Sequence, residues 1–488
     1  MIDASVGVLI VLVTLVAIVA VGLSAGRDTD VETYTSARNS QGPVSLGLSF
    51  LAAGMGAWIL FAPPEVGAGV GLVAVFGYAI GAALPVLLFA LLGRRIRVAV
   101  PTGHSLGEFA RLRYGRGFAA WVFIVSMGYM FLFVTAELTA IAGVTGIVAG
   151  VDPRLTVVAV ALATLGYTTW GGLRASLVTD RWQAGLIVAL LAVGFVAVLG
   201  SVDGPGAALT GSGLLGIGSV GIEVAATLII AVTAANMFHQ GYWQRVWAAG
   251  DEQALRRGAG IGIALTVPVV VLVGLFGIIA AGSGQGLDVS PVPFFALTTG
   301  LPAIIGGVVV VLGVALVASS VDTLETGLFS LVAAEAPGID LVRARLITVG
   351  LMVPAVIVAF QGHSVLRLFL IADLLCAGVV VPLLAGLWSR ATPAGAGAGA
   401  LAGLVGAVLP GVLMTGSLVG AVQAATFPGS VPTLPPFAGA LGLSALVTVV
   451  VSLLGRRSTE VVDLGAPGRP SEGADPTGPE DREVGVNG

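Results

Sequence analysis

About thirteen apolar segments, most of them close to the roughly 20 residues that a helix needs to cross a bilayer, follow one another along this chain. A crossing helix also satisfies its own backbone hydrogen bonds inside the hydrocarbon. Only 10% of the 488 residues are charged and the mean hydropathy is +1.04, whereas a soluble domain carries roughly 25% charge. We therefore predict an all-α, polytopic membrane protein. The predicted spans are residues 4–24, 44–62, 67–92, 118–149, 155–170, 178–200, 219–239, 259–282, 303–333, 346–361, 365–387, 395–415 and 437–455.

The arginines predict the orientation, because cytoplasmic loops collect positive charge. The chain has no lysine, so its 22 basic residues are all arginine. If the N-terminus is outside, only Arg154 and Arg367 fall in outer loops. This bias predicts an N-out, C-in, multi-pass protein of the cell inner membrane, with an odd number of spans. The inner arginines are then Arg27, Arg38, Arg94, Arg95, Arg97, Arg111, Arg113, Arg116, Arg174, Arg181, Arg245, Arg256, Arg257, Arg343, Arg345, Arg390, Arg456, Arg457, Arg469 and Arg482.

The composition changes near residue 455 and divides the chain into two parts. Residues 1–455 are the predicted transmembrane domain, and 456–488, rich in Gly, Pro, Asp and Glu, are a predicted disordered cytoplasmic tail. The single cysteine, Cys376, excludes a disulfide within the chain and is assigned to packing. A Walker-type phosphate loop needs a lysine, so ATP hydrolysis by this chain is excluded and no cofactor is expected. An ion gradient is the remaining energy source.

One motif is typical of a hydrolase. Residues Gly103 to Gly107 match the G-x-S-x-G pattern of a nucleophile elbow, with Ser105 as the nucleophile. The short loop between two spans has no room for a sheet, an acid and a base, so we predict no catalytic residues. Ser105 instead fits a helix N-cap, with Glu108 completing a capping box.

Two spans contain residues that weaken a membrane helix. The second span has Gly54 and Gly56 in its middle, and the seventh ends in the polar residues Asn236, His239 and Gln240. An unwound stretch exposes carbonyls to a cavity, and interrupted helices in corresponding places of two halves indicate a site near the middle of the membrane. Close helix packing by small residues is the alternative for the glycines.

The ninth span carries the polar run Ser319, Ser320, Asp322 and Thr323, followed by Glu325. Polar groups are costly in hydrocarbon, so these side chains should face water, an ion or one another. Hydroxyl and carbonyl oxygens suit a hard cation such as sodium. Back-bonding of the serines to their own helix is the alternative.

Several motifs resemble those of the sodium/solute symporter family, whose members carry proline, glucose, pantothenate, monocarboxylates or urea. The resemblance covers residues 1 to about 455. The matching runs are a G-G-L-x-A…T-D-x-x-Q pattern from Gly171 to Gln183, a Q-R-x-x-A-A element from Gln244 to Ala249, the junction from Val381 to Gly395, and the loop from Ser105 to Arg113.

The resemblance implies a leucine-transporter-like inverted repeat. Its two five-helix halves would cover residues of about 42–200 and 217–388, with one further helix before them and two after. It also implies a sodium site. The carbonyls of Ala52, Met55 and Leu316 and the hydroxyls of Ser319 and Ser320 would be the ligands, and Asp180 would lie near the cytoplasmic exit of the ion.

The sequence departs from the proline carriers of this family at two places, one at Gly54 and one in the seventh span, where the polar Asn236 and His239 replace aromatic residues. Gly54 stands where proline carriers have an aspartate, and Asp322 is placed to restore that negative charge. The coupling ion is therefore predicted to be sodium, with a proton as the alternative. The run Tyr242 to Arg245 is similar to the Y-W-Q-R run of urea carriers.

The predicted function is inward symport of a small polar organic solute, with proline or a related amino acid as the leading candidate. Urea, sugars and monocarboxylates are the alternatives, and a passive channel and a membrane sensor are alternative classes. Glu137 resembles a scaffold element of sugar carriers. We expect the lipid bilayer, the solute and the ion as partners, with neither nucleic acid nor an obligatory protein. The residues predicted to surround the solute are Trp58, Asn236, His239 and Gln240.

Overall fold

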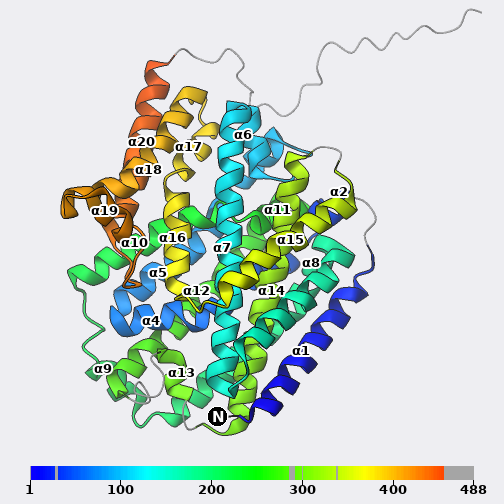
Figure 1. Ribbon diagram of the computed structural model, residues 1–488, viewed down its shortest axis with the longest axis vertical. Coiled ribbons are helices and arrows are strands. Elements are labelled where there is room, and N and C mark those ends of the chain that lie inside the picture. The colour runs from blue at the N-terminus through cyan, green and yellow to red at the C-terminus, as the bar shows by residue number, and fades with distance from the viewer. Residues whose placement is uncertain (1, 28–30, 285–291, 299–300, 337–338, 456–488) are drawn as a thin grey trace, which may run out of the picture.

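The computed structural model describes residues 2–27, 31–284, 292–298, 301–336 and 339–455. The regular structure in these ranges is helical, as predicted (Figure 1). The predicted tail, 456–488, lies outside the described residues. The helices are α1 (Ala4–Ser24), α2 (Val31–Ser36), α3 (Pro43–Gly54), η1 (Ala57–Leu60), α4 (Ala62–Gly69), α5 (Leu72–Ala99), α6 (Leu106–Tyr114), α7 (Arg116–Ala149), α8 (Pro153–Ser201), α9 (Pro205–Gly211), α10 (Ser219–Asn236), α11 (Gln240–Ala248), α12 (Glu252–Ser283), α13 (Pro293–Thr298), α14 (Ala303–Glu335), α15 (Leu341–Ala359), α16 (Val365–Ala377), α17 (Val380–Leu384), η2 (Ala385–Leu387), α18 (Pro393–Thr415), α19 (Leu418–Ala424) and α20 (Leu434–Leu454).

Ten of the described helices are long and apolar enough to cross a membrane. Two bent helix pairs raise this number to 12 if each pair forms one span. The first pair joins α3 to η1 and α4 at an angle of 60°, and the second joins α16 to α17 and η2 at 46°. The interruption predicted for the second span is therefore present.

Helix α8 accounts for the difference from the predicted number of spans. Its 49 residues would make a straight helix of about 74 Å, more than twice the roughly 30 Å of a bilayer core. Gly172, with φ 50° and ψ −143°, breaks it near the predicted boundary between two spans.

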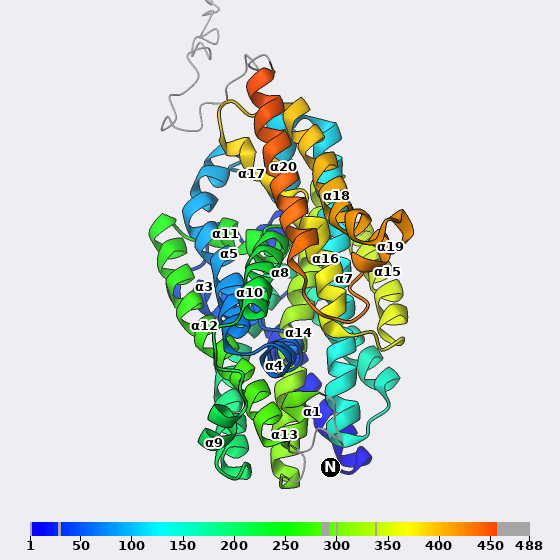
Figure 2. The ribbon, with the colours of Figure 1, turned by 90° about the vertical axis from the view of Figure 1, so that its left-hand side faces the viewer.

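The neighbours of α8 show that the chain reverses at this break. Just before α8, the Val148 carbonyl accepts a hydrogen bond of 3.1 Å from the Ile2 N–H. Gly172 packs against Tyr34, beyond the other end of α1. After α8, α9 lies again at the end of the molecule that holds the N-terminus (Figures 1 and 2). The total of thirteen spans and the N-out orientation stay predictions.

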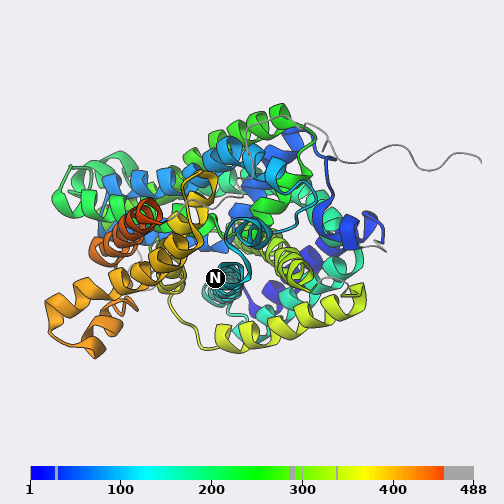
Figure 3. The ribbon, with the colours of Figure 1, turned by 90° about the horizontal axis from the view of Figure 1, so that it is seen from above.

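Helix α14 forms the centre of the helix packing. It contacts α1, α7, α8 and α15, and its residues from Val309 to Leu331 are almost all buried. Helices α18 and α20 pack on each other at one side of the molecule (Figure 3). This arrangement places the polar run of the ninth span in the interior.

The break at Gly172 gives the first testable prediction. A Cβ atom here would lie 2.6 Å from atoms of Tyr34, and φ of 50° is strained for any residue with a side chain, by about 1–3 kcal/mol. Gly172→Ala should therefore lower the thermal unfolding temperature of the purified protein in detergent. The control is Gly166→Ala, where nothing lies within 4 Å of the added methyl group and alanine favours the helix. Equal unfolding temperatures for the two variants would contradict the reversal.

Candidate functional site

The break between α3 and η1 is held open by a carboxylate. The last helical bond of α3 runs from the Met55 N–H to the Leu51 carbonyl at 2.9 Å. The Ala57 N–H then donates to Glu137 Oε2 of α7 at 2.8 Å, instead of to the carbonyl four residues earlier. Glu137 is fully buried, so this bond satisfies a backbone donor that the break would otherwise leave unpaired. The scaffold role expected for Glu137 fits this contact.

Two of the predicted sodium ligands, the hydroxyls of Ser319 and Ser320, lie on α14 beside this break. Both α3 and η1 contact α14. Ser319 Oγ donates to Asp180 Oδ1 at 3.0 Å, which leaves the serine lone pairs available to a cation. Ser320 Oγ is buried and turned toward the Glu137 carboxylate. A hydroxyl that donates its proton to a carboxylate keeps its lone pairs available to a cation.

The predicted carbonyl ligands lie at the same two elements. Ala52 is in the last turn of α3 and Met55 is its C-cap, with φ −98° and ψ 88°. Leu316 is buried on α14, one turn before Ser319 and Ser320. The donor set is therefore made of oxygens from the broken second span and from α14, a chemistry that fits sodium.

Asp180, predicted near an exit path, forms a buried ion pair. Its Oδ2 lies 2.7 Å from Arg245 Nη2, and both side chains have 0% exposure. Ser49 Oγ of α3 donates to the same carboxylate oxygen at 2.5 Å. Arg245 also donates to Thr323 Oγ1 of α14 at 2.9 Å. Arg245 was predicted to be an inner-loop charge, and the Gln244-Arg245 motif was the only sequence signal of its buried role.

Asp322 is surrounded by hydroxyl groups. Tyr167 donates to its Oδ2 at 2.7 Å, Ser176 to its Oδ1 at 2.8 Å, and Thr179 to its Oδ2 at 3.0 Å. All three donors come from α8, on both sides of the break at Gly172. The Asp322 carboxylate is thus bound by α8, and its replacement of the aspartate missing at Gly54 stays a prediction.

Glu325, one turn further along α14, has a similar environment. Thr164 donates to its Oε1 and Thr168 to its Oε2, both at 2.7 Å. The two threonines are four residues apart and so share one face of α8. Among the described residues, no ion pair reaches Asp322 or Glu325. The four-residue spacing of these threonines is the sequence signal for two hydroxyls on the same face of one helix.

A small cavity lies between the broken helices. Its volume of about 40 Å³ is enough for only a few waters, at roughly 10–15 Å³ each. An organic solute therefore fits only after the helices move apart. The cavity is lined by Gly54, Met55, Trp58, Tyr78, Ala82, Tyr129, Phe133, Val232, Asn236, Tyr242, Thr266, Phe369 and Asp373.

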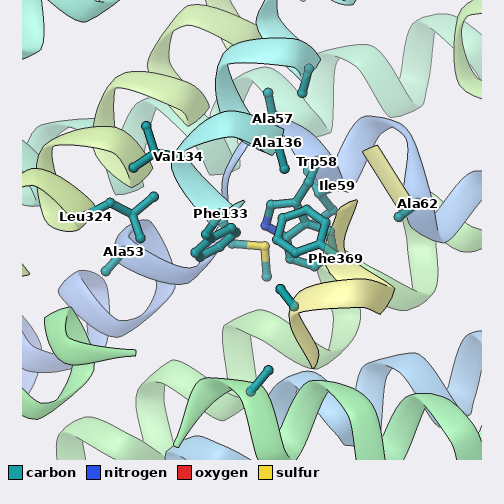
Figure 4. Packing of buried hydrophobic residues seen from close by; sticks show 14 of the residues in the cluster. Ala53, Ala57, Trp58, Ile59, Ala62, Phe133, Val134, Ala136, Leu324 and Phe369 are labelled. Atoms are coloured by element: carbon teal, nitrogen blue, oxygen red, sulfur yellow. The ribbon is translucent and has the colours of Figure 1, made fainter. Parts of the chain in front are cut away.

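Six of the thirteen residues that line the cavity are aromatic. Trp58 stacks on Tyr78 with 5.5 Å between ring centroids. It also makes an edge-to-face contact with Phe369, with 6.0 Å between ring centroids. Phe133 lies 4.9 Å from Phe369 (Figure 4). Such rings present negative faces that attract cations.

Asp373 is the acidic group of the cavity. It belongs to α16 and is 5% exposed. In the described part of the chain, no basic side chain pairs with it and no hydrogen bond reaches its carboxylate. Asp373 was not among the predicted site residues, although a lone acid in an apolar span is a signal of function.

The four residues predicted to surround a solute separate into two groups. Trp58 and Asn236 line the cavity. His239 does not line the cavity. It is fully buried beside the lining residue Tyr242, with 4.5 Å between the ring centroids, and neither of its ring nitrogens has a hydrogen-bond partner among the described residues. Gln240 lies away from the cavity and donates to the His104 carbonyl and to Ser330 Oγ. The helix that begins at Gln240 turns this side chain toward the scaffold.

Gly54 has a steric reason for lacking the aspartate of proline carriers. A Cβ atom on Gly54 would lie 1.9 Å from the Tyr242 hydroxyl. The phenol of the seventh span therefore fills the space that a side chain at position 54 would need.

The G-x-S-x-G pattern forms a helix cap. Ser105 Oγ accepts from the Glu108 N–H, and the Glu108 carboxylate accepts from the Ser105 N–H, so the predicted capping box is confirmed. Burial alone would raise the pKa of Glu108, but hydrogen bonds from His104 and Ser105 outweigh it and lower that pKa below its usual value.

The Asp180–Arg245 pair gives the second prediction. Removing one partner of a buried ion pair costs about 3–5 kcal/mol, because the other charge stays buried without compensation. Asp180→Asn and Arg245→Gln should each lower the unfolding temperature strongly. The control is Arg343→Gln, which removes an exposed ion pair with Asp340 and should have little effect. A normal unfolding temperature for both buried variants would show that the pair does not hold the helices together.

Comparisons with known proteins agree with this architecture. No protein-family model matches the chain. A spermidine transporter of Candida albicans is 29% identical over 363 residues, which cover 72% of this chain and 69% of that protein. A Na⁺-coupled sialic acid symporter in a substrate-bound, outward-open state has a similar structure, with a TM-score of 0.73, 14% identity, and coverage of 93% of this chain and 99% of that one.

A second structural neighbour is Mhp1, a nucleobase-cation-symport-1 family transporter, in a closed conformation. Its TM-score is 0.55 at 14% identity, and the match covers 86% of this chain and 99% of that one. These matched proteins are transporters and not enzymes. The predictions that the chain is a transporter and that it is not an enzyme are therefore confirmed.

Proposed function

We propose that this protein is a secondary transporter that couples inward sodium flux to uptake of a small organic cation, a protonated amine, across the plasma membrane. The observation that carries the proposal is Asp373, a buried carboxylate without a cationic partner in a cavity walled by aromatic rings. A buried charge needs a partner, and an ammonium group would pair with the carboxylate while the rings add cation–π attraction.

The charge of the cavity separates the candidate solutes. Among the described lining residues there is one carboxylate and no basic side chain. A zwitterionic amino acid such as proline would bring a carboxylate of its own toward Asp373. Urea, sugars and monocarboxylates would leave Asp373 without a counter-charge. An amine therefore fits better than the amino acid expected from the sequence, and the spermidine transporter among the relatives supports this class.

Sodium coupling rests on the oxygens around the break in the second span. The buried Ser320 hydroxyl and the carbonyls near Met55, at the C-terminal end of α3, would receive the ion. The ion would then lie directly beside Trp58 and the cavity, so that ion and solute binding stabilise the same position of the broken helix. A proton is the second candidate, since Asp322 is held by hydroxyls alone among the described residues.

The third prediction tests the amine. In proteoliposomes with an inward sodium gradient, the purified protein should accumulate a radiolabelled monoamine such as butylamine. Asp373→Asn should raise the KM for this amine about tenfold to a hundredfold, as expected for a lost charge-assisted hydrogen bond. Thr266→Val is the control, because it changes another lining residue without changing charge. Accumulation of proline instead of amines by the unmodified protein would refute the proposal.

The fourth prediction tests the ion. Ser319→Ala combined with Ser320→Ala should keep the helix, because alanine favours it, but should raise the sodium concentration for half-maximal uptake about tenfold to a hundredfold. Solute affinity should fall as well, since coupling between two ligands is reciprocal.

The control for this double variant is Ser330→Ala on the same helix, whose hydroxyl bonds to the His104 carbonyl at 3.1 Å. This variant should keep the sodium dependence of the unmodified protein. If the double variant also keeps it and uptake follows an imposed pH gradient, the proton at Asp322 replaces sodium as the coupling ion.

A further inference from the structure

A second hollow opens at the end of the molecule that holds the N-terminus. Its volume is about 460 Å³, an order of magnitude above that of the inner cavity. Its walls come from α4, from the end of α7 and from the connection between α15 and α16, and they include Phe61, Thr139, Ile147 and Phe360. The Ile2 N–H donates to Val148, the neighbour of Ile147, which places the hollow at this end. We call this hollow the vestibule.

Glu65 is the acidic group of the vestibule. It lies in the first turn of α4 and is partly buried. Among the described residues, no basic side chain pairs with it and no hydrogen bond reaches its carboxylate. The partial positive charge at the start of a helix, about half an elementary charge, offsets only part of the carboxylate charge. The Glu65 carboxylate thus lies beside the Phe61 ring without a basic partner, and His363 is the other titratable residue in the wall of the vestibule.

The vestibule and the inner cavity lie on consecutive turns of one element. Trp58 lines the inner cavity and Phe61 lines the vestibule. The two residues are three apart, at the start and just past the end of η1, which corresponds to a rise of about 6 Å. Trp58 also stacks on Tyr78, another wall residue of the inner cavity. The two unpaired carboxylates, Asp373 and Glu65, therefore belong to two hollows that adjoin the same short helix, and each hollow has aromatic rings in its wall.

We propose that Glu65 forms an outer subsite for a second ammonium group, so that the transporter selects linear di- and polyamines over monoamines. This inference rests on the proposed function, because Asp373 must hold the first ammonium group. An aliphatic amine is protonated at neutral pH, as the lysine side chain is. A diamine is then the complement of two separated carboxylates, and its alkyl chain would lie along the rings of Trp58 and Phe61. A monoamine can engage only Asp373 at one time.

The fifth prediction compares two amines in the same proteoliposomes. Glu65→Gln keeps the shape of the side chain and removes its charge. It should raise the KM for 1,4-diaminobutane and for spermidine at least about tenfold, and the KM for butylamine by less than about twofold. Asp373→Asn should raise the KM for all three amines. Asp203→Asn is the control, because Asp203 is an exposed acid between α8 and α9 at the same end of the molecule and should affect none of them.

The outcomes distinguish the two proposals. If Glu65→Gln raises the KM equally for butylamine and for 1,4-diaminobutane, or changes neither, the outer subsite is refuted while amine transport through Asp373 stands. If the unmodified protein transports no amine, the proposed function itself fails. If Glu65→Gln cannot be purified in a folded state, Glu65→Ala and competition of the diamine against butylamine uptake provide the same comparison.

Discussion

The buried pair of Asp180 and Arg245 is the contact on which the arrangement of the broken helices depends. Arg245 stands on α11, the short helix that follows α10, and Asp180 stands on α8. Ser49 of α3 donates to the same carboxylate oxygen, and Thr323 of α14 accepts from the same guanidinium. One ion pair thus joins four elements inside an apolar medium. The attraction between the two charges is strong only while water is excluded. The pair therefore stabilises the state in which these four helices are packed against one another.

The sequence was sufficient for features that depend on local composition. Hydrophobic length predicted the spans, and paired glycines predicted the break after Gly54. The capping box at Ser105 followed from spacing alone. Because the bilayer forces each apolar segment to satisfy its own backbone, these features depend little on tertiary contacts.

Features that depend on partners from distant segments could not be predicted in the same way. Arg245 looks like a positive loop residue until the fold places Asp180 beside it. Asp373 is one acid in an apolar run, and only the fold shows that Trp58, Phe133 and Phe369 surround it. Conversely, Gln240 is polar and close to a break, but the start of α11 directs it to Ser330. A polar residue in a span indicates that its side chain has a partner. Only the fold shows whether that partner is a ligand or another part of the protein.

The reversal of α8 at Gly172 has a mechanical consequence. Thr164 and Thr168, before the reversal, donate to Glu325, and Tyr167 from the same limb donates to Asp322. Ser176 and Thr179, after the reversal, also donate to Asp322. Both limbs of the hairpin therefore bind buried acids of α14. Separating either limb from α14 would remove hydrogen-bond donors from a carboxylate in a dry interior. The hairpin and α14 should thus move as one rigid block, and the hinge of an alternating-access cycle should lie outside it, at the break between α3 and η1.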